Sequence, residues 1–359
     1  PFLQYGWQPQ VMAVRGPVKV IKSGVYEVYD PRMDPEESVD LSGKIEVGQE
    51  ILDALRDYKI APSVNGQAST GPLDQEAREQ LAALGYVGWD SPAPLREDAP
   101  IARNMTHLFA DLDLGSTLFA REEYEASIRV FDRVLAEDPM NLMVVVRLAV
   151  AYSVLGNEER ADRVFARAQE IHSDNIDLQH YIAMHNFRFD RWDEAAPMFE
   201  DVLEVMPHKL PALEALARIR EKQGRFDEAA RLTERIIPLK EAPAADWIRL
   251  GELEMAMTDT PGAIRAFEEA RRLQGASFSH SLELGVCYLA ARRPAEAAAE
   301  LDRVPRDHPG YAMALFNRAQ VSVLMGEPDW QNRVRMAYEM GDPEIRRMIE
   351  NEPLFQGRF

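Results

Sequence analysis

The sequence predicts a mainly α fold, in which about seven helical hairpins form a superhelical solenoid behind a small α+β segment. Two observations lead to this prediction. Small and aromatic residues recur with a period of 34 residues through most of the chain. Before Asn104, short β-branched and aromatic runs are instead separated by Gly-Pro or Ser-Gly, as in strands joined by tight turns. At 359 residues, the chain has room for two or more domains.

The repeat is defined by slots, where slot 1 is the first residue of a unit. Slots 7 and 8 hold Leu or Ile followed by Gly or Ala, slot 20 is usually Ala, and slot 24 is usually Phe. Small residues at slots 8 and 20 let two antiparallel helices approach closely, and the slot-24 ring fills the space between successive hairpins. An unrelated helix bundle is the alternative, but bundle packing does not impose a constant period. The units begin at Leu108, Leu142, Ile176, Leu210, Ala244, Phe278 and Ala312.

This pattern resembles the tetratricopeptide repeat (TPR). The resemblance implies a superhelix that binds a protein or peptide partner along its concave face, which the family lines with slots 2, 5, 9 and 12. We expect the groove to be mainly apolar, and it lacks the Lys, Arg and Asn set with which some family members hold a peptide's carboxylate. Tight winding that buries these side chains among themselves is the other interpretation. The expected groove residues are Val146, Val150, His180, Met184, Phe187, Arg218, Ile248, Glu252, Met255, Leu282, Val286, Leu289 and Phe316.

Composition argues against several classes of partner and site. A net charge of −19 disfavours nucleic acid and anionic membrane surfaces, because both need clustered Lys and Arg. No apolar run is long enough for membrane insertion. One cysteine, Cys287, excludes an intrachain disulfide and is expected to be a small core residue. His180 and His185 are five residues apart on one helix and should face different ways, so we expect no metal site there.

The chain divides, on these patterns, into four expected segments. Residues 1–46 are β-rich, with strands in VMAVRG, VKVIKSG and VYEVYD. Residues 47–100 hold a helix in KIEVGQEILDALRDYKI, a second helix in LDQEAREQLAALGYVG that Gly85 would end, and a linker rich in Pro and acidic residues. Residues 101–343 form the solenoid. Residues 344–359 are a charged helix and tail expected to cap its last hydrophobic face.

The first forty residues resemble a second family, the carboxyl-terminal end of sulfatases in the alkaline phosphatase superfamily. Asp40 and Val28 are mild departures, standing where that family commonly has Asn and Leu. LDQEAREQLAALGYVG is similar to the segment that closes the hydrolase domain in bacterial sulfatase-like proteins carrying TPRs. The matching residues are Gly6-Trp7, Ala13-Val14-Arg15, Lys19-Val20-Ile21, Tyr29-Asp30, Asp34-Pro35, Glu37 and Leu41.

The sulfatase resemblance implies a longer parent protein, bacterial and periplasmic or exported, that binds a divalent cation. A chain that opens PFLQYGWQPQ is consistent with a piece of such a protein. The family's Cys/Ser-x-Pro-x-Arg motif does not occur in these residues, so we expect no catalytic residue and no cofactor on this chain. The sequence therefore predicts an interaction module attached to the end of a sulfatase-like hydrolase, binding a partner or the catalytic domain itself. The alternative is a stand-alone TPR adaptor or scaffold.

Overall fold

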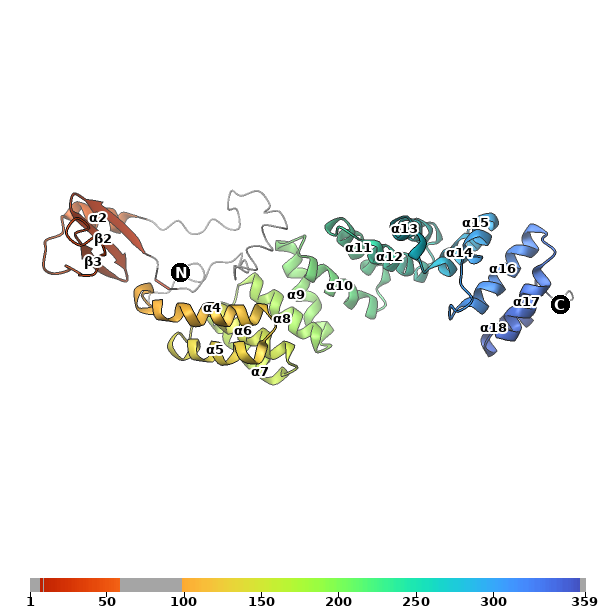
Figure 1. Cartoon of the computed structure of the whole chain (residues 1–359), viewed down its shortest axis with the longest axis horizontal. Helices are drawn as coiled ribbons and strands as arrows, with labels where there is room; N and C mark the ends of the chain where they lie inside the picture. Colours follow the sequence, from red (N-terminus) through yellow and green to blue (C-terminus); the bar gives the residue numbers. More distant parts are fainter. Residues whose placement is uncertain (1–6, 9, 59–98, 356–359) are drawn as a thin grey trace. The chain divides into compact units, whose positions relative to one another are not determined.

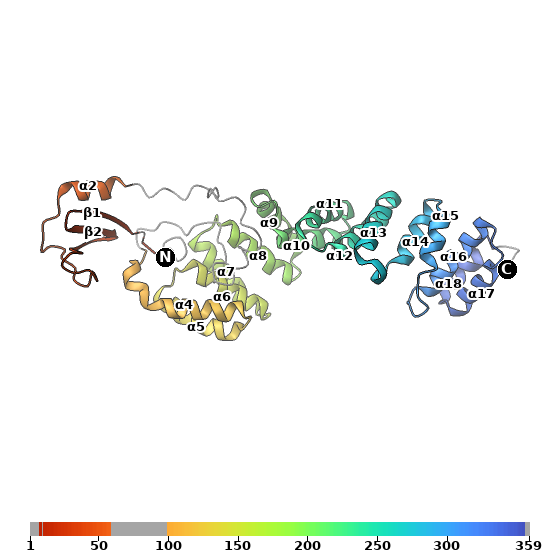
Figure 2. The same ribbon diagram turned by 45° about the horizontal axis from the view of Figure 1, so that its top comes forward.

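The computed structural model describes residues 7–8, 10–58 and 99–355, which fall into two compact units, Pro1–Val205 and Met206–Phe359 (Figures 1 and 2). Helices dominate both units, as the sequence predicts. The expected helix in LDQEAREQLAALGYVG, with its Gly85 end, lies outside the described residues, as does most of the linker after it.

The first unit begins with a three-stranded antiparallel sheet in the order β1-β2-β3. Gly16 and Gly24 lie in the turns with φ of 62° and 74°, values that glycine adopts without strain. Val20 pairs with both Ala13 and Val28, so one face of the sheet is a continuous apolar surface. The three expected strands and the helix that follows are confirmed. They are β1 (Val11–Arg15), β2 (Val18–Ser23), β3 (Val25–Tyr29) and α2 (Gln49–Asp57).

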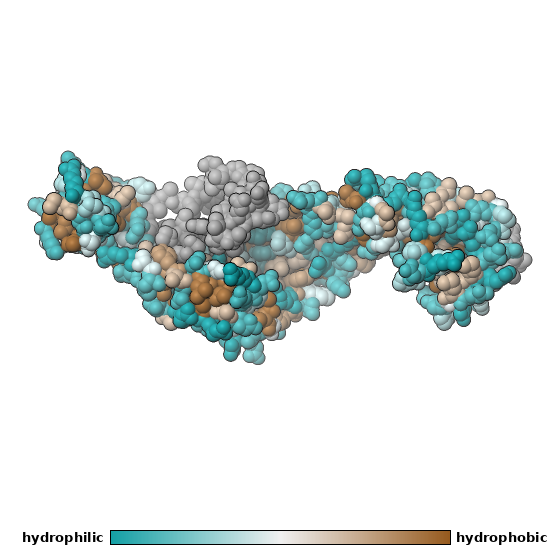
Figure 3. Space-filling view, viewed as in Figure 1, coloured by the Kyte–Doolittle hydropathy of each residue, from teal (hydrophilic) through white to brown (hydrophobic). Residues whose placement is uncertain are grey.

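The two faces of this sheet have different surroundings. Val20 and Val28 form a small core with Ile51 and Leu55 of α2, which packs beside β1. Successive residues of a strand point to opposite faces, so Met12 and Val14 lie on the other side. They are 64% and 60% exposed, and Figure 3 shows apolar residues, in brown, on the surface of this segment. The sheet therefore keeps an uncovered apolar face at β1.

Three helical hairpins follow in the first unit, after the 3-10 helix η1 (Ala102–Leu108). Asn141 and Asn175 begin the second and third hairpins, each with a side chain that accepts a hydrogen bond from the backbone N–H three residues on. Gly156 and Asp190 provide the left-handed turn in these hairpins, with φ of 75° and 57°. The pairs are α4 (Phe109–Ala120) with α5 (Tyr124–Glu137), α6 (Leu142–Val154) with α7 (Glu158–Ile171), and α8 (Ile176–Arg188) with α9 (Trp192–Val205).

The second unit contains four hairpins and a terminal helix. α6, α8, α10 and α12 all begin at the residues where the 34-residue period places a new unit. The hairpins are α10 (Leu210–Lys222) with α11 (Phe226–Ile236), α12 (Ala244–Ala256) with α13 (Thr260–Gln274), α14 (Ser281–Ala290) with α15 (Pro294–Leu301), and α16 (Tyr311–Met325) with α17 (Trp330–Met340). Short 3-10 helices, η2 (Ile237–Leu239) and η3 (Gly275–Ser277), follow α11 and α13, and α18 (Pro343–Asn351) comes last.

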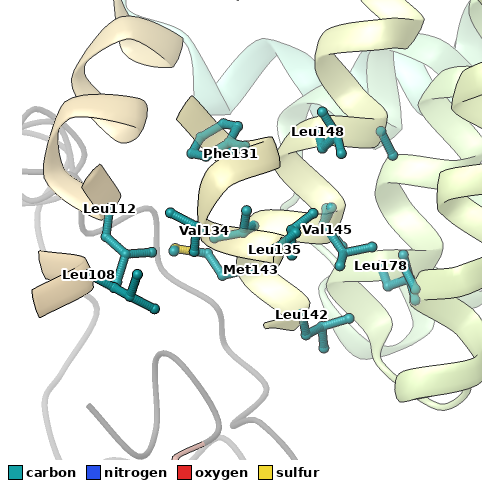
Figure 4. Packing of buried hydrophobic residues seen from close by; sticks show 14 of the residues in the cluster. Leu108, Leu112, Phe131, Val134, Leu135, Leu142, Met143, Val145, Leu148 and Leu178 are labelled. Carbon is teal, nitrogen blue, oxygen red and sulfur yellow. The ribbon is translucent and has the colours of Figure 1, made fainter. Parts of the chain in front are cut away.

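Close packing of the two helices in a hairpin depends on the small residues at slots 8 and 20. A Cβ atom built on Gly115 would lie 2.6 Å from Phe131, and one on Gly251 would lie 2.9 Å from Phe267. Those distances are shorter than van der Waals contact, so the slot-24 ring occupies the space that a side chain at slot 8 would need. Figure 4 shows Phe131 within the apolar cluster that links α4, α5, α6 and α8. The predicted roles of slots 8 and 24 are therefore confirmed in these hairpins.

Trp7 connects the N-terminal segment to the first hairpins. Its side chain is fully buried in the apolar cluster of the repeats, with its ring 5.5 Å from that of Phe109. Its Nε1–H donates to Asp138 Oδ2 at 2.7 Å, and Asn141 Nδ2 donates to the same oxygen at 2.9 Å. Trp7 thus supplies a hydrogen bond to a buried carboxylate of the first repeat. Trp7 is also one of the residues on which the sulfatase resemblance rests, and here it is part of the core of the repeats.

Ala161→Leu tests the role of slot 20. Ala161 is fully buried where α7 faces α6, so the three extra heavy atoms of a leucine side chain cannot fit without displacing neighbours. We expect a loss of about 1–3 kcal/mol in the free energy of unfolding, measured with urea. Ala166→Leu, at an exposed position of the same helix, is the matched control and should change stability little. Equal unfolding midpoints for both variants would show that the helix register is wrong.

Candidate functional site

The first helices of the hairpins carry the expected groove. α4, α6 and α8 pack side by side in the first unit, and α14 packs beside α16 in the second. Slots 2, 5, 9 and 12 recur every three or four residues, so they lie on one face of each of these helices. Each unit therefore has its own candidate surface, made of one face from each first helix.

In the first unit, two of the five expected groove residues are closed off. Val146 is 1% exposed and belongs to the apolar core that α6 shares with α8, and His180 is 6% exposed, with its ring 6.2 Å from that of Phe199. The expectation that these two side chains face a partner is wrong, because slot 5 of α6 and of α8 lies where neighbouring helices meet. Val150, Met184 and Phe187 are only half-buried.

In the second unit, the expected residues divide into three groups. Arg218 and Glu252 are exposed. Phe316 is 3% exposed and meets Phe355 edge to face at 6.0 Å, so the C-terminal tail of this chain covers it and its expected place in an open groove is wrong. The remaining side chains are half-buried and apolar, and most of them pack against the core of α13 to α16. They are Ile248, Met255, Leu282, Val286 and Leu289.

His185 and Cys287 are held in the interior of the protein by packing and hydrogen bonds. His185 Nδ1 lies 2.9 Å from Ser153 Oγ and its Nε2 lies 3.0 Å from Asp162 Oδ1, so both ring nitrogens are engaged. Burial lowers the pKa of His185 and raises the pKa of Cys287 to about 11. Cys287 is therefore a thiol at neutral pH. Across residues 7–8, 10–58 and 99–355, no three His, Cys, Asp or Glu side chains converge as a metal site would require.

A cavity that the sequence reasoning missed lies between α11, α12 and α13. Its volume is about 450 Å³, and Glu254 lines it at slot 11 of its unit, where Tyr152 and Tyr288 stand in two other units. Burial, and then the nearby carboxylate of Asp259, raise the pKa of Glu254 to about 7. The sequence signal that could have located this cavity is an acidic residue, Glu254, at a slot that faces inward. The lining residues are Glu234, Trp247, Leu250, Glu254, Gly262, Arg265, Ala266, Glu268 and Glu269.

Comparison with protein families supports the repeat assignment. One family model described as tetratricopeptide repeat matches residues 112–176 and 248–312, and a second model of the same description matches residues 187–250. Together they cover more than half of the chain. No curated protein matches the sequence. The family-model matches begin at residue 112, so the sulfatase resemblance of the first residues stays a prediction.

Several solved structures of TPR proteins are similar to this chain. The C-terminal part of a TPR repeat-containing protein from Cytophaga hutchinsonii is 13% identical, with a TM-score of 0.51 over 65% of this chain and 97% of that one. A TPR protein from Parabacteroides merdae is 14% identical, with a TM-score of 0.43 over 68% and 97%. YrrB, a TPR protein described as having an unusual peptide-binding site, is 15% identical, with a TM-score of 0.45 over 52% and 97%. Within the described ranges, no helix combines the length and hydrophobicity needed to cross a bilayer.

Glu254→Gln tests the raised pKa. A carboxyl group of ordinary pKa loses its proton in the unfolded chain near pH 4.5, whereas native Glu254 keeps its proton until about pH 7. The native state is therefore destabilised as pH rises through this window, and glutamine, which cannot ionise, removes that effect. We expect the stability gained by the substitution to be about 1–3 kcal/mol larger at pH 8 than at pH 5, measured by urea unfolding.

Glu339→Gln, at an exposed position of α17, is the control for this experiment. Its effect on the free energy of unfolding should be the same at pH 5 and pH 8. A Glu254→Gln effect that is the same at pH 5 and pH 8 would contradict the assignment.

Proposed function

We infer the function from the family, because this chain is a tetratricopeptide repeat protein. TPR domains are consistent with a role in protein–protein interaction. We propose that this one binds a polypeptide segment on the faces of its first helices. The observation that supports this proposal most directly is the position of Val150, Met184 and Phe187, which remain half-buried on adjacent helices α6 and α8.

The chemistry of this surface suits apolar anchors of a partner. Val150 and Met184 both occupy slot 9, and Phe187 stands at slot 12 beside them. Covering them with apolar side chains would contribute roughly 25 cal/mol for each Å² removed from water. Met184 can adapt to anchors of different shape, because its side chain is unbranched and flexible. The acidic net charge of −19 would also favour encounter with a basic partner.

We further propose that the module belongs to the end of a sulfatase-like hydrolase, so that the partner is either a separate polypeptide or the hydrolase domain. The uncovered β1 face supports this proposal, because Met12 and Val14 are 64% and 60% exposed on a strand at the edge of its sheet. Exposed apolar faces are features that proteins normally cover. The repeats themselves are equally consistent with a stand-alone adaptor, which would leave the β1 face exposed.

Substitution on the first-helix face tests the proposal. The full chain serves as bait against native lysate and, separately, against a sulfatase-like hydrolase domain supplied in trans. Val150→Glu and Met184→Glu should each reduce the captured partner at least about tenfold, because a carboxylate would be desolvated against apolar anchors. Ala166→Glu, on the exposed face of α7, is the matched control and should capture as the unmodified chain does. Undiminished capture by both face variants, with unchanged circular dichroism, would contradict the proposal.

A further inference from the structure

In two hairpins of this protein, the side chains at slots 11 and 19 contact each other. In α6 and α7 the Arg160 guanidinium lies 5.5 Å from the centre of the Tyr152 ring. In α10 and α11, Arg220 Nε lies 3.0 Å from Glu228 Oε2. In both hairpins an inward-facing side chain at slot 11 meets a partner of complementary chemistry at slot 19.

The hairpin of α12 and α13 lacks that complement. Slot 11 is Glu254 and slot 19 is Gly262, and a Cβ atom on Gly262 would lie 2.7 Å from Glu254 Oε1. The glycine therefore leaves room for the carboxyl group but supplies no side chain to pair with it. Glu254 is 8% exposed, and its Oε2 has no hydrogen-bond partner among the residues that the structure describes. A buried polar atom without a partner is uncommon in native proteins and calls for an explanation.

The cavity beside Glu254 has the composition of a site for an organic cation. Trp247 and Leu250 of α12 supply apolar surface, and the carboxylates of Glu234, Glu268 and Glu269 outnumber the single lining guanidinium of Arg265. Two of these carboxylates are already engaged. Glu268 accepts a hydrogen bond from Tyr288 Oη at 2.5 Å, and Glu269 lies 2.8 Å from Arg272 Nη2. Glu234, the third, is exposed to solvent, so Glu254 is the buried acceptor left for a ligand.

We propose that this cavity binds an alkylammonium group, whose N–H donates to Glu254 Oε2 while its alkyl chain packs against Trp247 and Leu250. A tryptophan face also attracts a cation through its quadrupole. A metal ion fits poorly, because it needs several oxygen ligands at once and the lining carboxylates do not converge on a point. A cavity of about 450 Å³ is within the range of small-ligand sites.

Two sources share this chemistry, the side chain of a lysine in a polypeptide and a free diamine. The site is made of α11, α12 and α13, and it uses none of Val150, Met184 and Phe187. The inference therefore does not rest on the proposed function, and either can fail without the other.

Binding of a cation at this position must be coupled to a proton. A positive charge next to Glu254 favours its ionised form, so a ligand that binds at pH 6 displaces the proton that the raised pKa retains. The charges that act on Glu254 come from each neighbouring element: Glu234 on α11, Asp259 before α13 and Arg265 on α13. The two carboxylates oppose its ionisation and Arg265 favours it. These three charges are present with or without the ligand. The change in the ionisation of Glu254 on binding therefore comes from the positive charge of the ligand.

Calorimetric titration of the full chain tests this proposal. The probes are 1,5-diaminopentane and the blocked peptide acetyl-Gly-Lys-Gly-amide, each at pH 6 in two buffers of different ionisation enthalpy. We expect saturable binding of at least one probe, with a buffer-dependent enthalpy that reports release of most of a proton. Binding of the diamine alone would identify a free amine as the ligand, and binding of the peptide would identify a lysine side chain.

Variants locate the site. Glu254→Gln should weaken binding more than about tenfold and abolish proton release, since the charged acceptor is lost. Trp247→Phe should weaken binding but keep the proton release, and Glu339→Gln should change neither. The proposal would be overturned if neither the diamine nor the peptide showed saturable binding. Unmodified-chain binding at pH 6 without proton release, undiminished binding by Glu254→Gln, or a response to magnesium or calcium chloride in place of the amines would also overturn it.

Discussion

The contact between a small residue at slot 8 and a large side chain at slot 24 is the constraint on which the repeats depend. Gly115 lies under Phe131, Gly251 under Phe267, and Gly285 under Leu301, each too close to carry a Cβ atom without a shift of its neighbour. This contact sets how near the two helices of a hairpin approach. The fully buried alanines at slot 20, such as Ala161 and Ala263, let the same two helices meet at a second level. Successive hairpins then stack on the rings that these contacts hold in place.

Much of this arrangement could be predicted, because it is local. A period of 34 residues defines the hairpins, and Asn141 and Asn175 begin helices at the residues that the period indicates. The strands around Gly16 and Gly24 are equally local features. The sequence pattern could not show that Val146, His180 and Phe316 are covered, since their burial depends on packing between elements. Phe355, which covers Phe316, is 39 residues away along the chain. Trp7 and Asp138, joined by a hydrogen bond, are 131 residues apart.

Whether a buried polar group has a hydrogen-bond partner distinguishes structural positions from candidate binding positions. Asp138 accepts hydrogen bonds from Trp7 and Asn141, and His185 is held by Ser153 and Asp162. These groups are satisfied within the protein and stabilise it. Within the described part of the chain, Glu254 Oε2 has no such partner, and it borders a cavity. A solenoid of this kind offers two chemically different surfaces: half-buried apolar side chains on the first helices, and an acidic cavity between hairpins.

The central claim is that a polypeptide partner binds on the first helices, and hydrogen–deuterium exchange tests it most directly. Exchange is measured by mass spectrometry on the full chain, free and with its captured partner bound. The account predicts slower exchange in the partner complex for residues 146–154 of α6 and 180–188 of α8, with α7 unchanged. Protection confined to α7 and α9, with α6 and α8 unaffected, would place the partner on the second helices and contradict the account.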